Sequence, residues 1–137
     1  VDMRYLIDTN VICETIKTTP NAKVINWFNN IDNNSLYISV LTIGEIQKGL
    51  EKTTDIDRKE KISTWLDHDL LPWFDNRILD INRLIAIKWG EISSKSKTKP
   101  VTDSLIAATA LHHNLLLVTR NVQDFDYSNL EIINPFL

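Results

Sequence analysis

Short apolar runs alternate with amphipathic stretches along most of this chain. The apolar runs predict buried strands over residues 5–7, 36–40, 77–81, 115–119 and 132–133. Between the runs, apolar side chains recur at helical spacing and predict helices over residues 11–16, 21–28, 42–50, 56–71, 81–94 and 103–113. Strands that alternate with helices are typical of a mainly parallel sheet with helices on both faces, so the predicted fold class is α/β.

Local signals predict where several of these helices begin and end. Thr9 or Asn10 is expected to cap the first helix. The stretch from Thr42 to Glu45 matches a capping box and predicts a helix start. Pro72 is expected to end the long helix before it. The helices that follow the second strand are expected to form a small lobe.

Length and composition fit one ordinary domain, expected over residues 3–137, with residues 1–2 interpreted as an expression remnant before Met3. Of the 137 residues, 43% are hydrophobic, which excludes a disordered tail. The net charge of −3 excludes a generally cationic nucleic-acid binder. One cysteine, Cys13, allows neither an internal disulfide nor a cysteine-based zinc site, and a reducing cytoplasm is the expected compartment. No apolar run approaches the roughly 18 residues that span a bilayer, so no membrane association is expected.

Four acidic residues lie where predicted strands end or helices begin. Asp8 directly follows the first strand, and Glu45 lies in the first turn of the helix after the second strand. Asp103 opens the predicted helix over 103–113, and Asp124 follows the fourth strand. Because ligands of such sheets bind at the carboxyl ends of the strands, we expect these acids to converge at one edge.

A cluster of acids at one sheet edge favours a bound cation. Two carboxylates about 4 Å apart repel each other by roughly 4 kcal/mol at an effective dielectric constant near 20. Such groups either bind protons or share a divalent metal. Oxygen ligands without His or Cys suit Mg²⁺ or Mn²⁺, which polarise a phosphoryl oxygen and activate water. The reaction class that follows is metal-assisted hydrolysis of a phosphodiester.

Each acid also has a simpler structural explanation. Glu45 fits a capping-box partner, or an ion-pair partner of Lys48 on a solvated helix face. Asp8 and Asp103 fit helix caps, and Asp124 fits an ordinary turn residue. The residues by themselves leave the metal cluster and these local roles open.

Four strings of residues, in this order along the chain, resemble the PIN-domain family. They are LIDTNVI over residues 6–12, SVLTIGEIQKGL over 39–50, TDSLIAATA over 102–110 and LVTRNVQDF over 117–125. The likeness runs from Met3 to the C-terminus and is to the VapC/FitB type of toxin, which belongs to type II toxin–antitoxin pairs. It implies a parallel five-stranded sheet sandwiched by helices and a Mg²⁺- or Mn²⁺-dependent endoribonuclease.

The resemblance assigns roles to individual residues. The family's first three acids fall on Asp8, Glu45 and Asp103. The fourth falls either on Asn121 or on Asp124, and we favour Asp124 as the acid with Asn121 as its polar neighbour. By the same likeness, all four acids bind metal directly or through water, and Glu45 helps to deprotonate the nucleophile.

Further residues are expected to support these acids or to bind RNA. The expected supporting residues, which would orient carboxylates and water, are Thr9, Asn10, Thr119 and Asn121. The expected phosphate contacts are Lys48 and Arg120. Three further lysines precede Asp103 and fit either an RNA backbone track or a solvated loop: Lys95, Lys97 and Lys99.

The likeness also implies partners: an RNA substrate, a cognate antitoxin protein that docks near the pocket, a second copy of the chain in a homodimer, and operator DNA only through the antitoxin. The alternative function is a catalytically silent PIN domain that serves as an antitoxin-partnered nucleic-acid-binding module. A haloacid-dehalogenase-like phosphatase with Asp8 as nucleophile is a weaker alternative, because its second aspartate would stand at Asn10.

Overall fold

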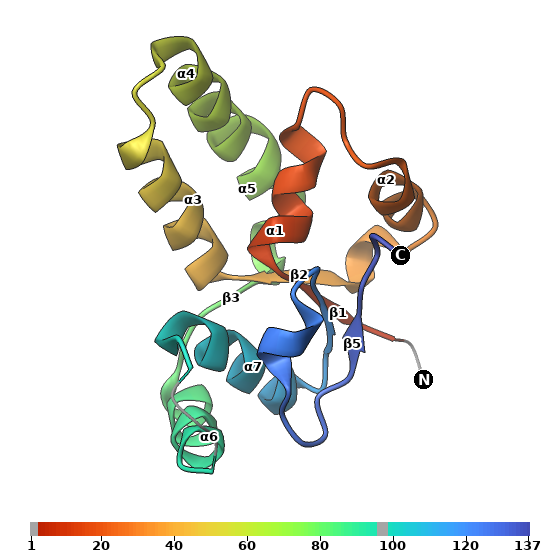
Figure 1. The fold of residues 1–137 in the computed structure, drawn as a ribbon, viewed down its shortest axis with the longest axis vertical. Helices are drawn as coiled ribbons and strands as arrows, with labels where there is room; N and C mark the ends of the chain where they lie inside the picture. Colours follow the sequence, from red (N-terminus) through yellow and green to blue (C-terminus); the bar gives the residue numbers. More distant parts are fainter. Residues whose placement is uncertain (1–2, 96–98) are drawn as a thin grey trace.

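A five-stranded parallel sheet forms the centre of the protein in a computed structural model, which describes residues 3–95 and 99–137. Its strands are β1 (Tyr5–Ile7), β2 (Leu36–Ser39), β3 (Ile78–Leu79), β4 (Leu116–Val118) and β5 (Ile132–Ile133). Their order across the sheet is β3-β2-β1-β4-β5, and every neighbouring pair is parallel (Figure 1). The predicted α/β class and the five-stranded parallel sheet are therefore confirmed.

The strand order reverses between β1 and β4, at the middle of the sheet. From β1 the chain moves outward to β2 and β3, and then returns to the other side of β1 to form β4 and β5. The backbone N–H of Asp8 extends the pairing by donating to the carbonyl of Val118, at 2.9 Å. The ends of β1 and β4 therefore lie together at the point where such sheets bind ligands.

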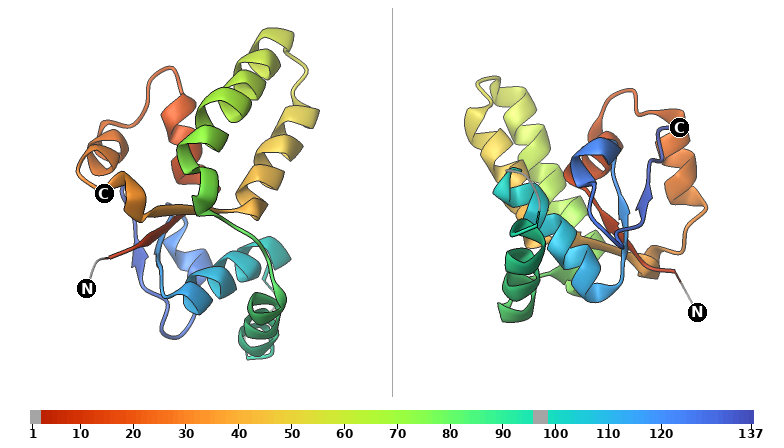
Figure 2. Two further views of the ribbon diagram at one scale, coloured as in Figure 1. Left: turned by 180° about the vertical axis from the view of Figure 1, so that it is seen from behind. Right: turned by 60° about the horizontal axis from the view of Figure 1, so that its bottom comes forward.

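Helices cover both faces of the sheet (Figure 2). The main helices are α1 (Thr9–Ile12), α2 (Ala22–Asn29), α3 (Val40–Lys52), α4 (Ile56–Trp65), α5 (Leu71–Phe74), α6 (Arg83–Ser93) and α7 (Val101–His113). The shorter 3₁₀ turns are η1 (Cys13–Ile16), η2 (Asn33–Ser35), η4 (Asp75–Arg77) and η5 (Val122–Phe125), and η3 (Leu66–Leu70) is a π-helical turn. Helices α3 and α4 extend side by side away from the sheet and form the expected lobe. Of the helices in the described part of the chain, none is long and apolar enough to cross a membrane.

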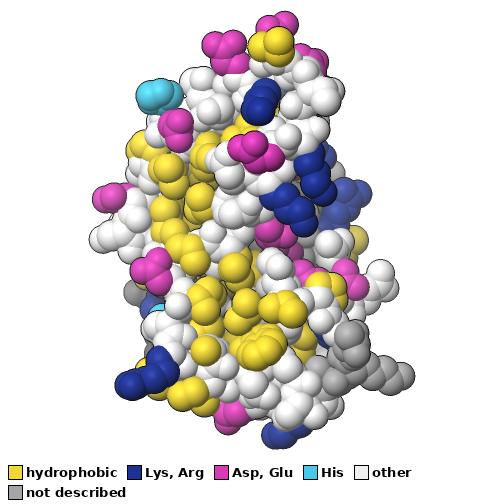
Figure 3. Space-filling model, turned by 90° about the vertical axis from the view of Figure 1, so that its left-hand side faces the viewer, with side chains coloured by type: hydrophobic (Ala, Val, Ile, Leu, Met, Phe, Trp, Pro, Cys, Tyr) yellow, Lys and Arg dark blue, Asp and Glu magenta, His cyan; other side chains and the backbone are white. Residues whose placement is uncertain are grey.

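The face under α6 and α7 has the smaller of two apolar cores. Leu6 and Leu117 point to this face and pack near Ile106 of α7, which is also buried. Helix α6 covers α7 from outside but leaves Leu84 and Ile87 each 53% exposed. Figure 3 shows hydrophobic side chains gathered over the lower half of this side of the molecule.

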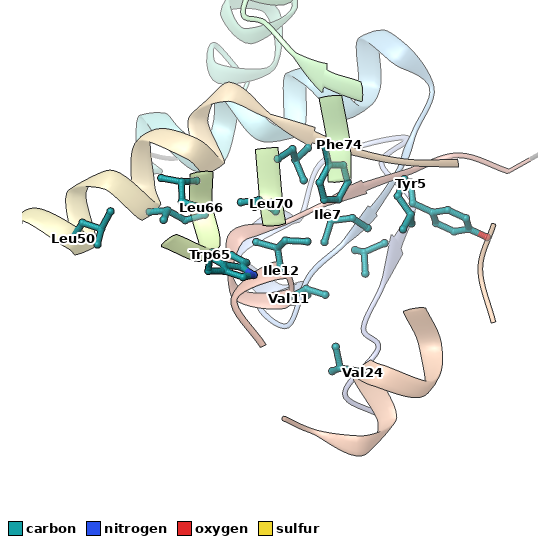
Figure 4. Close-up of a cluster of buried hydrophobic side chains, with 14 residues drawn as sticks. Tyr5, Ile7, Val11, Ile12, Val24, Leu50, Trp65, Leu66, Leu70 and Phe74 are labelled. Carbon is teal, nitrogen blue, oxygen red and sulfur yellow. The ribbon is translucent and has the colours of Figure 1, made fainter. Parts of the chain in front are cut away.

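The opposite face has the larger core, formed by β1, β2 and helices α1 to α5 (Figure 4). Ile7 of β1 packs among Val11 and Ile12 of α1, Leu70 of η3 and Phe74 of α5, and all five side chains are fully buried. Alternation along β1 sends Leu6 to one face and its neighbours to the other. The core therefore fixes the direction in which β1 delivers the residue that follows it, Asp8.

Two predicted helix starts are wrong, and both differ by a few residues. Asp8, not Thr9 or Asn10, caps α1, with its side chain accepting from the backbone N–H of Thr9. Helix α3 begins at Val40 with Ser39 as its cap, so Thr42 is a buried residue of the first turn rather than a capping-box cap. In each case the strand runs directly into the helix and its last polar residue satisfies the first N–H groups.

Pro72 does not end the helical segment, contrary to the prediction. The chain stays helical to Phe74, and Pro72 stands in the first turn of α5, where its missing N–H is tolerated. The π-helical turn η3 directly before it adjusts the hydrogen bonding that proline disrupts. The segment ends at Asp75, which has a left-handed φ of 41°.

The remaining boundaries differ from prediction in smaller ways. The strand expected over 77–81 is only β3, because 3₁₀ turn η4 occupies Arg77. Helix α6 begins after Ile81, with the side chain of Asn82 capping the N–H of Ile85. Helix α7 begins at Val101, so Asp103 lies in its first turn and does not cap it.

Candidate functional site

Asp8 is a buried carboxylate between the ends of β1 and β4. Its Oδ1 accepts from the backbone N–H of Thr9 at 2.9 Å. Its Oδ2 accepts from Asn10 Nδ2 at 3.0 Å and from the Thr119 hydroxyl at 2.8 Å. Burial raises the pKa of Asp8, and the three hydrogen bonds oppose that rise. Asp8 therefore both caps α1 and presents a desolvated carboxylate at the switch point of the sheet.

A polar network holds the β4 end of the site against α1. Asn10 accepts at Oδ1 from the backbone N–H of Arg120, at 3.1 Å, and its Nδ2 lies 3.4 Å from the Thr119 hydroxyl. The Thr119 hydroxyl also accepts from the backbone N–H of Asn121, at 3.1 Å. Asn10 and Thr119 thus connect two chain segments more than a hundred residues apart. The exposed Asn121 enters this network through its backbone.

Glu45 reaches the site from α3, on the other side of α1. The hydroxyl of Thr9 donates to Glu45 Oε1 at 2.6 Å and lies 3.2 Å from the hydroxyl of the buried Thr42. Glu45 is exposed, while Ile46 and Leu50 of the same helix are buried, as helical periodicity predicts. Thr42 is a supporting residue that sequence reasoning missed. Its position three residues before Glu45, on the same face of α3, is the signal that could have identified it.

Asp103 is partly buried in the first turn of α7 and lies within electrostatic range of the other acids. Burial raises the pKa of Asp103 most, and the negative charges of Asp8, Asp124 and Glu45 raise it further. Lys99 has the opposite, smaller effect on this pKa. The four acids therefore share one electrostatic neighbourhood, although they come from four separate elements.

The acids are close but do not form a ready-made coordination sphere. Among the side chains of residues 3–95 and 99–137, no group of three or more Asp, Glu, His or Cys could hold a metal ion directly. The donors are all oxygens, and Mg²⁺ commonly retains several waters of its own. An ion at this edge would therefore bind partly through water.

The expected phosphate contacts and lysines lie at different places around the site. Arg120 is exposed, with its guanidinium 4.7 Å from the centre of the Phe136 ring, and Lys48 is exposed on α3. Lys95 is exposed after α6, Lys99 is half-buried before α7, and Lys97 lies outside the described residues.

We expect Asp103→Asn to raise the melting temperature of the metal-free protein at about pH 7.5. The raised pKa means that the folded protein binds this proton more tightly than the unfolded chain. The ionised carboxylate therefore destabilises the fold above its ordinary pKa of 3.8, and the gain from Asn shrinks as pH falls toward that value. Thermal unfolding in a chelator at several pH values measures the difference.

The matched control is Asp67→Asn, at an exposed acid of η3 far from this cluster along the chain. It should show no such pH-dependent gain. A lower melting temperature for Asp103→Asn at neutral pH would contradict the prediction, because it would mean that the favourable charge at the helix N-terminus outweighs the repulsion.

Comparison with known protein families and curated proteins gives concordant matches. The model of the PIN domain matches residues 5–127. Toxin FitB of Neisseria gonorrhoeae is 31% identical over 135 residues, covering 96% of this chain and 97% of the relative. VapC ribonuclease Y4jK of Sinorhizobium fredii is also 31% identical over 135 residues, covering 96% of each chain.

Solved structures agree with these matches. A crystal structure of FitAcB from Neisseria gonorrhoeae superposes with a TM-score of 0.89 at 30% identity, covering 96% of this chain and 98% of the other. A structure of FitAB bound to a DNA fragment gives 0.88 at 28% identity, with 97% and 96% covered. A toxin–antitoxin complex from Klebsiella pneumoniae gives 0.71 at 25% identity, with 96% and 97% covered.

Proposed function

This chain belongs to the PIN-domain family and is a toxin of the VapC/FitB type, and from this premise we propose that it is a Mg²⁺- or Mn²⁺-dependent endoribonuclease. By homology this chain is a ribonuclease, because its relative Y4jK is named a VapC ribonuclease. The observation that carries the metal proposal is the convergence of four acids: the pKa of Asp103 is raised first by burial and then by the negative charges of Asp8, Asp124 and Glu45. A dication would relieve that repulsion.

In the proposed mechanism the four acids would hold the metal, directly or through water. The bound ion would polarise a phosphoryl oxygen and lower the pKa of a water molecule. Thr119 and Asn10 fix the orientation of Asp8, and Thr9 fixes that of Glu45. Glu45 is exposed and would accept a proton from the attacking water. The electrostatic effect of Asp124 on Asp103 supports Asp124 as the fourth acid, with Asn121 as a polar neighbour.

The proposed reaction is attack of water on an RNA phosphodiester, which leaves a 5′-phosphate and a 3′-hydroxyl. The substrate is cellular RNA, and the proposed place of action is the cytoplasm. The other candidate, a catalytically silent module, has the same fold and partners and differs only in lacking this step.

We propose that the antitoxin docks in an apolar groove beside the acids. The groove has a volume of about 430 Å³ and lies between η1, α3 and α4. Its apolar lining residues include Cys13, Ile16, Ile46, Leu50, Ile62 and Trp65. Burial raises the pKa of the Cys13 thiol to about 11, so this cysteine contributes to the groove as an uncharged group.

Charge around the groove indicates the chemistry of its occupant. Lys17, Arg58 and Lys61 lie along it, and Thr9 and Glu45 belong to both the groove and the acid site. Figure 3 shows Lys and Arg side chains gathered above the Asp and Glu side chains at mid-height. The groove fits a protein segment with apolar side chains, acidic flanks and a cationic group at the Glu45 end. Such a segment would cover the acids, and operator DNA would bind through the antitoxin.

A second copy of the chain is the proposed partner for the outer face of α6. Leu84 and Ile87 stand one turn apart on this helix, and Val101 of α7 is 58% exposed. Exposed apolar residues grouped in this way are typical of a protein interface. Figure 3 shows an apolar area over the lower half of this side of the molecule, which fits a proposed homodimer contact there.

We expect Asp8→Asn to reduce Mn²⁺-dependent RNA cleavage by on the order of a hundredfold or more. Asn still caps a helix, so the fold should persist. Millimolar Mn²⁺ should raise the melting temperature of the unaltered protein by mass action, and less so that of the variant. Cleavage of single-stranded RNA and thermal unfolding measure the two effects, with Asp67→Asn as the control. An unaltered protein that binds RNA and antitoxin but neither cleaves nor responds to Mn²⁺ would establish the silent module instead.

We expect the double charge reversal Arg58→Glu/Lys61→Glu to weaken antitoxin binding by about tenfold or more, since rim charges govern association with an acidic partner. RNA cleavage by the free toxin should persist. Lys59→Glu is the matched control, because Lys59 is exposed on the same helix but does not line the groove. Titration with the cognate antitoxin measures affinity. Equal affinities for all three proteins would place the antitoxin elsewhere.

We expect Ile87→Glu to convert the homodimer into a monomer, because a buried charge on an apolar interface is strongly unfavourable. Sedimentation at several protein concentrations measures the assembly state. The variant should keep its melting temperature as a monomer, since Ile87 contributes little to the core. A dimer that survives this change would show that α6 is not the interface.

A further inference from the structure

Lys99 lies between the two elements that carry Asp103 and Asp124. It lies two residues before the start of α7, whose first turn contains Asp103. Its Nζ donates to the backbone carbonyl of Asp124 at 3.2 Å and lies 5.0 Å from the centre of the Tyr127 ring. A carbonyl and an aromatic face therefore hold the ammonium group at the rim of the acid site.

This placement distinguishes Lys99 from the other cations near the site. The guanidinium of Arg120 packs on Phe136, and Lys48 is exposed on α3. Lys99 is half-buried, and its positive charge acts on Asp103 to lower the pKa of that carboxyl. An ammonium group that is already ordered loses less side-chain entropy when a ligand arrives.

A cluster of four carboxylates repels an incoming polyanion, even where metal ions offset part of the charge. A cation fixed at the rim lowers that repulsion for a phosphate group beside the pocket. Lysine contacts phosphate as a point charge with several donors, without reading the base. An ammonium group has three N–H donors, and that of Lys99 uses one of them in the hydrogen bond to the Asp124 carbonyl.

We propose that Lys99 is a substrate-binding residue whose ammonium group contacts a backbone phosphate of the RNA next to the one that is cleaved. This inference rests on the proposed ribonuclease function. It assigns the phosphate contact to the α7 side of the site, rather than to Lys48 or Arg120. The contact is independent of base sequence, so it contributes affinity and not sequence choice.

The experiment measures RNA binding by Lys99→Met in the Asp8→Asn background, in which the RNA stays intact. Anisotropy of a labelled single-stranded RNA is followed in Mn²⁺ at several salt concentrations. We expect Lys99→Met to weaken binding by about three- to tenfold and to reduce the slope of log affinity against log salt by about 0.7. Lys95→Met is the matched control, since Lys95 is exposed before the same helix, and it should change neither quantity. Lys99→Arg keeps the charge and should keep most of the affinity.

Two further measurements separate the possible failures. The Mn²⁺-induced rise in melting temperature should be no smaller for Lys99→Met than for the unaltered protein, because loss of a cation beside the acids does not weaken their attraction for a metal ion. A reduced rise would overturn the proposal, because Lys99 would then act by holding Asp124 for the metal. Unchanged RNA affinity and salt slope would overturn it as well. If the unaltered protein fails to cleave RNA, the ribonuclease function is refuted, whereas the comparison of Lys99→Met with Lys95→Met still reports on the phosphate contact.

Discussion

The burial of one carboxylate, that of Asp8, is the constraint on which the site depends. An ionised group at the end of a buried strand loses much of its hydration, and this structure compensates with three donors. Two of them, from Thr9 and Asn10, come from the helix that Asp8 itself caps. The third, from Thr119, comes from the neighbouring strand. These contacts therefore connect the ends of β1 and β4 where the strand order reverses, and they fix the orientation of the Asp8 carboxylate.

The other acids add electrostatic repulsion, which the hydrogen bonds to Asp8 do not remove. Asp103 lies on α7, and beyond the effect of its burial, the negative charges of Asp8, Asp124 and Glu45 raise its pKa further. The raised pKa values mean that both ionised carboxylates reduce the stability of the fold at neutral pH, Asp8 through burial and Asp103 through burial and repulsion. Lys99 offsets part of this repulsion from the rim. The proposed divalent ion would offset far more, even though no group of three or more Asp, Glu, His or Cys side chains in residues 3–95 and 99–137 could hold it without water.

Much of the fold was predictable because its strands are short, apolar and separated by clear helical periodicity. Residues 5–7 and 132–133 were predicted to the residue. The errors arise where a strand passes straight into a helix: Ser39 and Asp8 act as caps, one turn or less before the polar residues that the local pattern favoured. The prediction that Pro72 ends the helix was wrong for a related reason, since the π-helical turn η3 before it accommodates the hydrogen bonding that proline disrupts. Such adjustments depend on tertiary packing and leave little trace in a single sequence.

The site could be predicted only in outline. Strand ends and helix starts indicate that Asp8, Glu45, Asp103 and Asp124 converge, but spacing says nothing of the hydroxyl of Thr9 that holds Glu45 or of the buried Thr42 beside it. Spacing also could not reveal that Lys99 donates to the backbone carbonyl of Asp124, because the two residues lie 25 positions apart in the chain. The resemblance to the PIN-domain family suggested the roles of the acids, whereas their hydrogen-bond partners depend on tertiary packing.

If the proposed functions hold, two shared residues would link RNA cleavage to its inhibition by the antitoxin. Thr9 and Glu45 belong to the acid site and to the apolar groove at once, since α1 forms a wall of both. A protein segment in the groove would therefore meet the hydroxyl and carboxylate that orient the proposed water. In this proposal, a segment in the groove would exclude RNA by occupancy alone, without a conformational change. The Lys and Arg side chains along the groove would attract an acidic segment and Lys99 would attract phosphate, so the two proposed ligands would compete at Glu45.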